Sequence, residues 1–167
     1  MVKDGLEKDN IVNDYQGMIV RKAKIDDVEK IYELIDYYAK DGLMLSKNMS
    51  YIYEHLRQYL VAEEAGELVG VGALRIFWSD LAEVCSIAVS PQQQKKGIGK
   101  AIVTQLEEEA RELGLSKVFA LTYQEGFFLN CNYQRIDKDL LPQKIWQDCL
   151  NCPKYDYCDE IAVIKTL

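Results

Sequence analysis

One segment, where a buried strand gives way to a helix through glycines, constrains this chain more than any other. Residues 81–89 (LAEVCSIAV) are apolar enough for a central strand, and beyond Pro91 the apolar residues recur at helical spacing from Ile98 to Leu113. Between them, residues 94–100 (QKKGIGK) combine two glycines with three lysines. The pattern predicts a strand that passes into a helix through a loop whose backbone closely approaches another group.

This loop has the features of an anion-binding site. Backbone N–H groups at the start of a helix lack intrahelical partners and lie at the positive end of the helix dipole. Gly97 and Gly99 carry no side chain to block them, and Lys95, Lys96 and Lys100 add positive charge. The whole chain has 20 basic and 27 acidic residues, a net charge of −7 that disfavours nucleic acid and anionic lipid. The loop therefore predicts a phosphate or pyrophosphate ligand, with a ligand-free turn as the alternative.

The remaining periodicity predicts an α+β fold with a mixed, mostly antiparallel sheet of six to seven strands and about four helices. Strands are expected at residues 18–23, 59–64, 67–78, 81–89, 117–122 and 161–165, with one more before the last. Helices are expected after Asp26, which could cap the first, after Ser50, from Ile98, and around 127–131. The final strand is expected at an exposed edge, where it could pair two copies into a homodimer.

The chain is expected to hold one domain. Its 167 residues suffice for one core, residues 1–16 read as a flexible charged leader, and residues 17–167 form the domain. The first residues lack the apolar centre of a secretory signal, and no stretch approaches about 18 uninterrupted apolar residues. A cytoplasmic protein is predicted.

The order of elements, with Val89 ending a strand and Gln94-x-x-Gly97-x-Gly99 opening a helix, resembles the acetyl-CoA loop of the Gcn5-related N-acetyltransferase (GNAT) superfamily. The resemblance covers the chain from Met18 onward. It implies that the strand 81–89 splays from a parallel neighbour and makes a V-shaped cleft for acetyl-CoA, the co-substrate. It also implies that the backbone of the strand end pairs with pantetheine and that the loop amides hold the pyrophosphate. The residues concerned are Ile87, Ala88 and Val89 on the strand, and Gln94, Lys95, Lys96, Gly97, Ile98, Gly99 and Lys100 in the loop.

Segments 38–45, 80–83, 86–89 and 118–122 are similar to the short, stand-alone bacterial N-acetylglutamate synthases. This resemblance implies acetylation of the α-amine of L-glutamate, the first step of arginine biosynthesis. That subgroup often has arginine at the positions of Lys47 and Cys85. Two alternatives therefore stay open: a GNAT enzyme for another amine (an amino acid, a polyamine or a protein), and a non-catalytic acyl-CoA-binding module.

Amine acylation requires a base, because an ammonium group has no free electron pair. Glu83 occupies the position where related enzymes often carry this base, and burial in an apolar strand would raise its pKa toward neutrality. The alternatives are a glutamate on the exposed face of the strand, or one paired with a nearby lysine. Many relatives have a tyrosine that acts as general acid on the helix after the strand at 117–122. Here Phe128 occupies that position, which leaves Tyr123, Tyr133 and Cys131 as candidate proton donors.

A dicarboxylate acceptor requires cationic partners near the cleft. Arg75 and Lys47 are the candidates, although Arg75 could equally be a solvated charge on a strand face. Tyr37, Tyr38 and Met44 could line the acceptor pocket, or the aromatic residues could belong to the core.

Three cysteines, Cys149, Cys152 and Cys158, lie within ten residues of the connection at about 140–159. Thiolates at such spacing are typical zinc ligands, which makes a structural zinc site one interpretation. Packed thiols and a redox pair are the others.

Overall fold

The protein forms one twisted eight-stranded sheet. The computed structural model describes residues 13–142, except residue 16, and residues 159–167. The strand order is β1-β2-β3-β4-β5-β6-β8-β7, and only the β5–β6 pair is parallel. The strands are β1 (Asn13–Tyr15), β2 (Met18–Lys22), β3 (Tyr59–Glu64), β4 (Glu67–Trp78), β5 (Leu81–Val89), β6 (Lys117–Thr122), β7 (Gln134–Ile136) and β8 (Ile161–Thr166).

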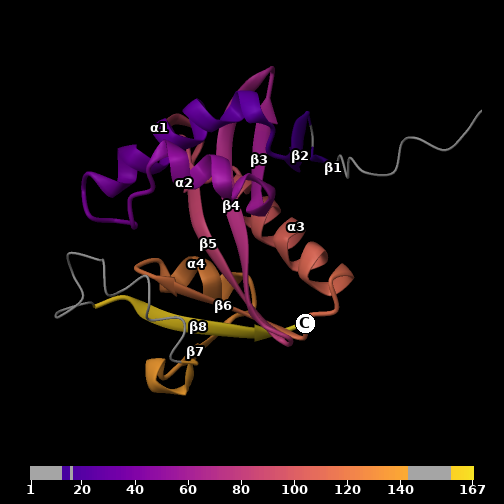
Figure 1. Ribbon diagram of the computed structural model, residues 1–167, viewed down its shortest axis with the longest axis vertical. Coiled ribbons are helices and arrows are strands. Elements are labelled where there is room, and N and C mark those ends of the chain that lie inside the picture. Colours follow the sequence, from indigo (N-terminus) through magenta and orange to yellow (C-terminus); the bar gives the residue numbers. More distant parts are fainter. Residues whose placement is uncertain (1–12, 16, 143–158) are drawn as a thin grey trace, which may run out of the picture.

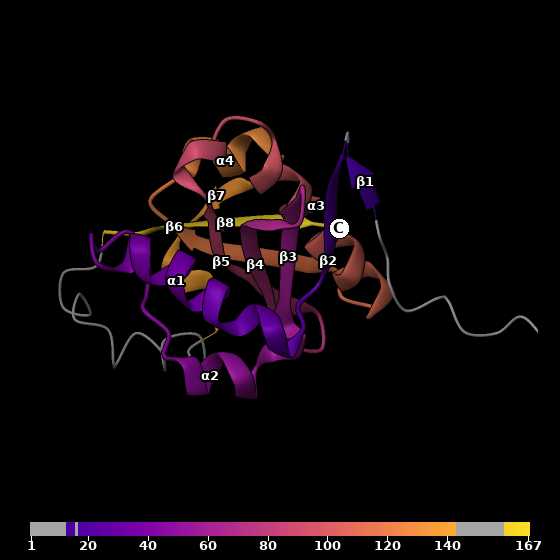
Figure 2. The same ribbon diagram turned by 90° about the horizontal axis from the view of Figure 1, so that it is seen from above.

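Helices cover both faces of the sheet. Figure 2 shows α1 (Val28–Ala39) and α2 (Met49–Glu54) on one face, and α3 (Ile98–Glu112) and α4 (Glu125–Asn130) on the other. Short 3₁₀ turns occupy Ile25–Asp27, Leu56–Gln58, Pro91–Gln93 and Lys138–Leu140. Within the described ranges, no helix combines the length and apolarity needed to cross a bilayer.

The two-sided cover explains why β3 has consecutive apolar residues. Side chains of a strand alternate between its faces, so Leu60 packs in the cluster that contains Ile102 of α3, whereas Tyr59 packs in the cluster that contains Ile31 and Ile35 of α1. Each face of the sheet therefore has its own hydrophobic core.

Strands β5 and β6 diverge soon after they begin. Their parallel pairing joins only Leu81–Glu83 to Lys117–Phe119, and beyond it the two strands run in different directions (Figure 1). On its other side β5 stays paired with β4, with a bulge at Ser86, whose φ is +54°. Beyond Glu83, the backbone edge of β5 that faces away from β4 is consequently open to a ligand.

Gly72, opposite this bulge, allows α3 and β5 to pack closely on β4. A Cβ at Gly72 would lie 2.5 Å from Cγ2 of Ile102 and 2.6 Å from Cδ1 of Ile87. We expect Gly72→Ala to lower the free energy of unfolding by about 1–3 kcal/mol in urea denaturation, as overpacked cores do. Gly126→Ala is the control, because no heavy atom lies within 4 Å of that Cβ. Equal stability of the two variants would contradict this packing.

The predicted fold class is confirmed, with differences at both ends of the sheet. β1 adds an eighth strand within the residues expected to form a leader. β8 lies between β6 and β7 and pairs with both. The expectation that residues 161–165 form an exposed edge is therefore wrong, and these residues offer no free edge for a homodimer; dimerisation itself stays a prediction.

The helix starts also differ from the expectation by one or two residues. Asp26 does not cap the first helix, because it lies inside the 3₁₀ turn Ile25–Asp27 that precedes α1; the Asp27 carboxylate reaches back to this turn and accepts a hydrogen bond from the backbone N–H of Lys24 at 2.7 Å. Asn48, not Ser50, caps α2 through the N–H of Tyr51 at 2.7 Å. Ser and Asn cap about equally well, so the local sequence alone did not determine whether Asn48 or Ser50 caps α2.

Candidate active site

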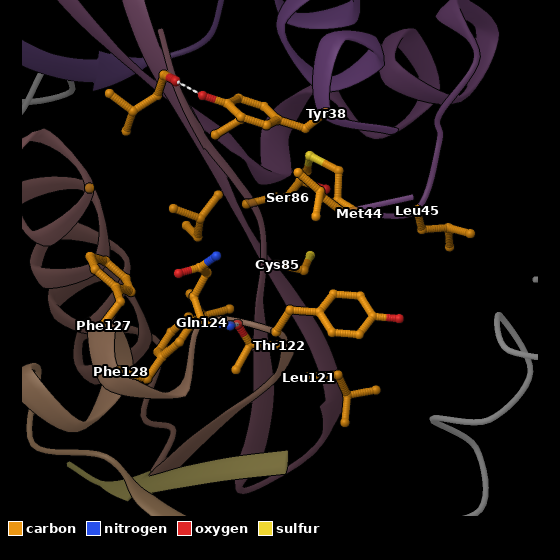
Figure 3. A pocket seen from close by; sticks show the side chains of 18 of the residues that line it. Tyr38, Met44, Leu45, Cys85, Ser86, Leu121, Thr122, Gln124, Phe127 and Phe128 are labelled. Atoms are coloured by element: carbon orange, nitrogen blue, oxygen red, sulfur yellow. Dashed lines mark hydrogen bonds between the residues drawn. The ribbon is translucent and has the colours of Figure 1, made fainter. Parts of the chain in front are cut away.

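A cavity of about 860 Å³ lies where β5 and β6 diverge. Figure 3 shows Phe127, Phe128 and Gln124 along one side, Met44 and Leu45 along the other, and Cys85 between them. Most residues predicted for the site line this cavity: Met44, Lys47, Arg75, Glu83, Ile87, Ala88, Val89, Gln94, Lys95, Gly97, Ile98, Gly99, Lys100 and Tyr123.

Tyr133 and Lys96 are the predicted site residues that the structure places elsewhere. Tyr133 is 2% exposed, and its ring packs against Phe128 with 5.1 Å between the ring centroids. Burial raises the pKa of the Tyr133 hydroxyl. The structure thus puts Tyr133 in the core and not among the residues that line the cavity, while the exposed Lys96 side chain donates to Gln93 at 2.7 Å.

The glycine loop has the backbone conformation of an anion cradle. Lys95 and Gly97 adopt left-handed φ values of +65° and +82°, and α3 begins directly afterwards. The first N–H groups of a helix have no intrahelical acceptor, and Gly97, Ile98, Gly99 and Lys100 line the cavity, so this turn offers backbone donors to an anion there. Gly99 has a further role that the sequence did not reveal: a Cβ there would lie 3.2 Å from the Phe127 ring, which packs on this turn.

Glu83 lies at the closed end of the cleft, where the β5–β6 pairing stops. In the sheet it stands beside Arg75 of β4 and Phe119 of β6. Burial raises the pKa of the Glu83 carboxyl to about 7, with a smaller contribution from nearby Glu160 and against the opposing positive charges of Arg75 and Lys47. A carboxyl with this pKa is divided between its acid and base forms near neutral pH, which suits a general base.

Lys47 reaches the cavity from the connection between α1 and α2. Its ammonium lies 4.3 Å from the centroid of the Tyr51 ring, and burial lowers the pKa of this amine. Tyr51 lines the cavity but was not predicted. No helical spacing could have revealed this contact, because Lys47 precedes Asn48, the extended N-cap of α2, and lies outside the helix that carries Tyr51.

An apolar wall completes the cavity beside these charges. It includes Met44, Leu45 and Leu121, with the Cys85 thiol pointing between them (Figure 3). Burial raises the pKa of Cys85 to about 12, so the thiol is neutral. Tyr37 is 53% exposed on α1, whereas Tyr38, predicted for the acceptor pocket, lies beside the glycine loop.

The predicted zinc ligands Cys149, Cys152 and Cys158 lie outside the described residues. Within residues 13–142 and 159–167, no group of three or more His, Cys, Asp or Glu side chains could hold a metal ion. A structural zinc site therefore stays a prediction from the sequence.

Comparison with known protein families decides what kind of fold surrounds this cavity. Residues 25–131 match the family described as acetyltransferase (GNAT) family. The chain belongs to the GNAT family. It is therefore an N-acetyltransferase that uses acetyl-CoA, and the predicted resemblance to this superfamily is confirmed.

Two curated relatives cover most of this acetyltransferase. An uncharacterized N-acetyltransferase of Chlorobaculum tepidum is 42% identical over 148 residues, which are 89% of this chain and 96% of the relative. An amino-acid acetyltransferase of Mycobacterium tuberculosis is 38% identical over 141 residues, which are 83% of this chain and 79% of the relative.

Two solved structures are also similar to this acetyltransferase. N-acetylglutamate synthase from Neisseria gonorrhoeae, complexed with coenzyme A and N-acetyl-glutamate, superposes with a TM-score of 0.84 at 26% identity. That match covers 92% of this chain and 36% of the gonococcal chain, so this protein spans about a third of that enzyme. A Mycobacterium tuberculosis protein in complex with CoA gives a TM-score of 0.77 at 32% identity, covering 89% and 98% of the two chains.

Proposed function

We propose that this protein transfers the acetyl group of acetyl-CoA to the α-amine of L-glutamate. The observation that carries the proposal is the presence of Glu83, Lys47 and Arg75 in one cavity with the glycine loop. Support also comes from the similar amino-acid acetyltransferase and from the N-acetylglutamate synthase that binds coenzyme A and N-acetyl-glutamate. Such an activity would start arginine biosynthesis.

The donor would lie along the open edge of β5. Backbone groups of Ile87 and Val89 would pair with the pantetheine amides, and the N–H groups that follow Gly97 would hold the pyrophosphate. Lys95 and Lys100 at the cavity add positive charge there. This local charge lets a chain with a net charge of −7 bind an anionic cofactor.

The reaction would be a direct transfer without an acyl-enzyme. Glu83 takes a proton from the α-ammonium, directly or through water, and the freed electron pair attacks the acetyl carbonyl carbon. Backbone N–H groups of β5 stabilise the oxyanion of the tetrahedral intermediate. Its collapse breaks the carbon–sulfur bond and releases the CoA thiolate, and the second proton of the former amine passes to this thiolate, directly or through Tyr123 or water. Of the three predicted proton donors, Tyr123 and Cys131 line the cavity and Tyr133 does not.

The pocket would recognise the two carboxylates of glutamate by positive charge and the methylene groups between them by an apolar surface. Lys47 and Arg75 supply positive charge for the two carboxylates. Met44 and Leu121, with the neutral Cys85 thiol, offer an apolar surface for the methylene groups. An acceptor with a cationic side chain is the second candidate, because Glu160 also lines the cavity and would attract such a charge.

Thiol release from acetyl-CoA, measured with each amino acid and with a polyamine in turn, tests this proposal. We expect glutamate to give the highest kcat/KM, because it presents a carboxylate to each of Lys47 and Arg75. Higher kcat/KM with lysine or a polyamine would favour the second candidate. Binding of coenzyme A without release on any amine would indicate a non-catalytic acyl-CoA-binding module.

A further inference from the structure

The hydroxyl of Tyr38 joins three elements at the entrance of the cavity. It donates a hydrogen bond to the backbone oxygen of Val89, the last residue of β5, and Figure 3 marks this bond with a dashed line. It also accepts a hydrogen bond from Nε2 of Gln94 at 2.6 Å. We call these three residues, Tyr38, Val89 and Gln94, the loop clasp.

The clasp has a rigid base. Tyr38 lies on α1, whose residues Ile31, Leu34 and Ile35 are buried in the core against the sheet. The Tyr38 ring also packs edge-on against Tyr37, with 5.0 Å between the ring centroids. Burial raises the pKa of the Tyr38 hydroxyl, so the group stays protonated and can donate one hydrogen bond while it accepts another.

The part of the chain that the clasp holds is the glycine loop. Directly after β5, the backbone N–H of Ser90 donates to the oxygen of Val69 on β4 at 2.8 Å. Gln94 is exposed and directly precedes Lys95. Lys95 and Gly97 are the two residues of the loop with left-handed φ. Left-handed backbone is costly for a lysine, so an anchor immediately before Lys95 helps to keep the loop in this conformation.

We infer that Tyr38 is a positioning residue for the cofactor: through Val89 and Gln94 it holds the glycine loop in the conformation that binds the pyrophosphate of acetyl-CoA. The inference rests on the proposed placement of CoA and concerns affinity for the donor. It assigns Tyr38 no contact with the reacting atoms. Preorganised backbone donors bind an anion more tightly because less ordering remains to be done on binding.

Tyr38→Phe removes both hydrogen bonds and retains the ring. We expect it to raise KM for acetyl-CoA about tenfold, since each neutral hydrogen bond contributes modestly, and to leave kcat within about twofold. S-acetylpantetheine lacks the pyrophosphate but would still pair with the backbone of Val89, so its kcat/KM should fall much less than that of acetyl-CoA. The matched control is Tyr37→Phe, which alters the neighbouring tyrosine, 53% exposed. It should leave kcat/KM unchanged for both acetyl-CoA and S-acetylpantetheine.

Gln94→Ala provides a second variant, which breaks the same network without a substitution in α1. We expect it to weaken donor binding in the same direction, and the double variant to be no weaker than Tyr38→Phe, because both changes break one network. Calorimetric Kd values for CoA supply a readout that needs no turnover, so failure to acetylate glutamate would not obscure the result. Equal losses with both donors, or no loss with acetyl-CoA, would overturn the role of Tyr38. A wild-type protein that does not bind CoA would instead refute the proposed donor site.

Discussion

Glu83→Gln is expected to lower kcat with glutamate by about 10²–10⁴-fold, the range that a positioned general base contributes. Glutamine has nearly the same shape as glutamate but cannot take the proton of the α-ammonium. The glycine loop lies at the other end of the cavity, so the Kd for coenzyme A should stay within about twofold of wild type. Thiol-release kinetics and calorimetry measure the two quantities.

The same variant should change the dependence of activity on pH. In the wild type, kcat should rise with pH and level off above about 7, the pKa to which burial raises the Glu83 carboxyl. In Glu83→Gln this rising limb of the pH profile of kcat should disappear. Glu67→Gln is the control, because the Glu67 side chain is 79% exposed at the start of β4 and should leave the profile unchanged. Full turnover in Glu83→Gln would remove Glu83 from the mechanism.

The raised pKa of Glu83 also predicts an effect on stability that does not depend on catalysis. Between pH 4.5, its ordinary pKa, and about 7, the folded protein keeps a proton that the unfolded chain has released. The contribution of this group to the free energy of unfolding therefore falls as pH rises through that window, by at most about 3 kcal/mol. Glu83→Gln cannot ionise, so in urea denaturation it should gain stability relative to wild type between pH 5 and pH 8.

Lys47→Met is expected to raise KM for glutamate about 10–100-fold, because it removes a charged partner of a carboxylate from a partly buried site. It should also move the rising limb of kcat above pH 7, since the positive charge of Lys47 lowers the pKa of Glu83. A lost packing contact alone would not shift the limb.

Lys40→Met is the matched control for Lys47→Met. The Lys40 side chain is 74% exposed and pairs with Asp36 at 2.9 Å on α1, so this variant should retain the KM and pH profile of the wild type. Coenzyme A affinity verifies that both variants are folded. A KM for glutamate within twofold of wild type, with an unmoved limb, would exclude Lys47 from acceptor binding.

The glycine loop and its flanking elements could be predicted because their signals are local. A continuous apolar run, a helical period and two glycines identify a strand, a helix and the turn between them. The bounds of β5 agree with the prediction, and α3 begins at the expected residue, Ile98, and ends one residue before Leu113. The position of Glu83 at the closed end of the cleft followed from the resemblance to the GNAT superfamily, not from the residue pattern alone.

Contacts between distant segments could not be predicted in this way. Tyr133 and Tyr123 are both tyrosines near α4, yet one is buried in the core and the other lines the cavity. Which of the two lines the cavity depends on how α4 packs, and the close contact of Phe127 with Gly99 contributes to that packing. The bond from Tyr38 to Val89 spans 51 positions, so no local period could reveal it.

The most direct test of the central claim is to identify the acetylated product by mass spectrometry during thiol release from acetyl-CoA with glutamate. We predict one N-acetylglutamate for each thiol released by the wild-type protein, and almost none of either with Glu83→Gln. Thiol release without N-acetylglutamate, or no release with glutamate under conditions where coenzyme A binds, would contradict the account.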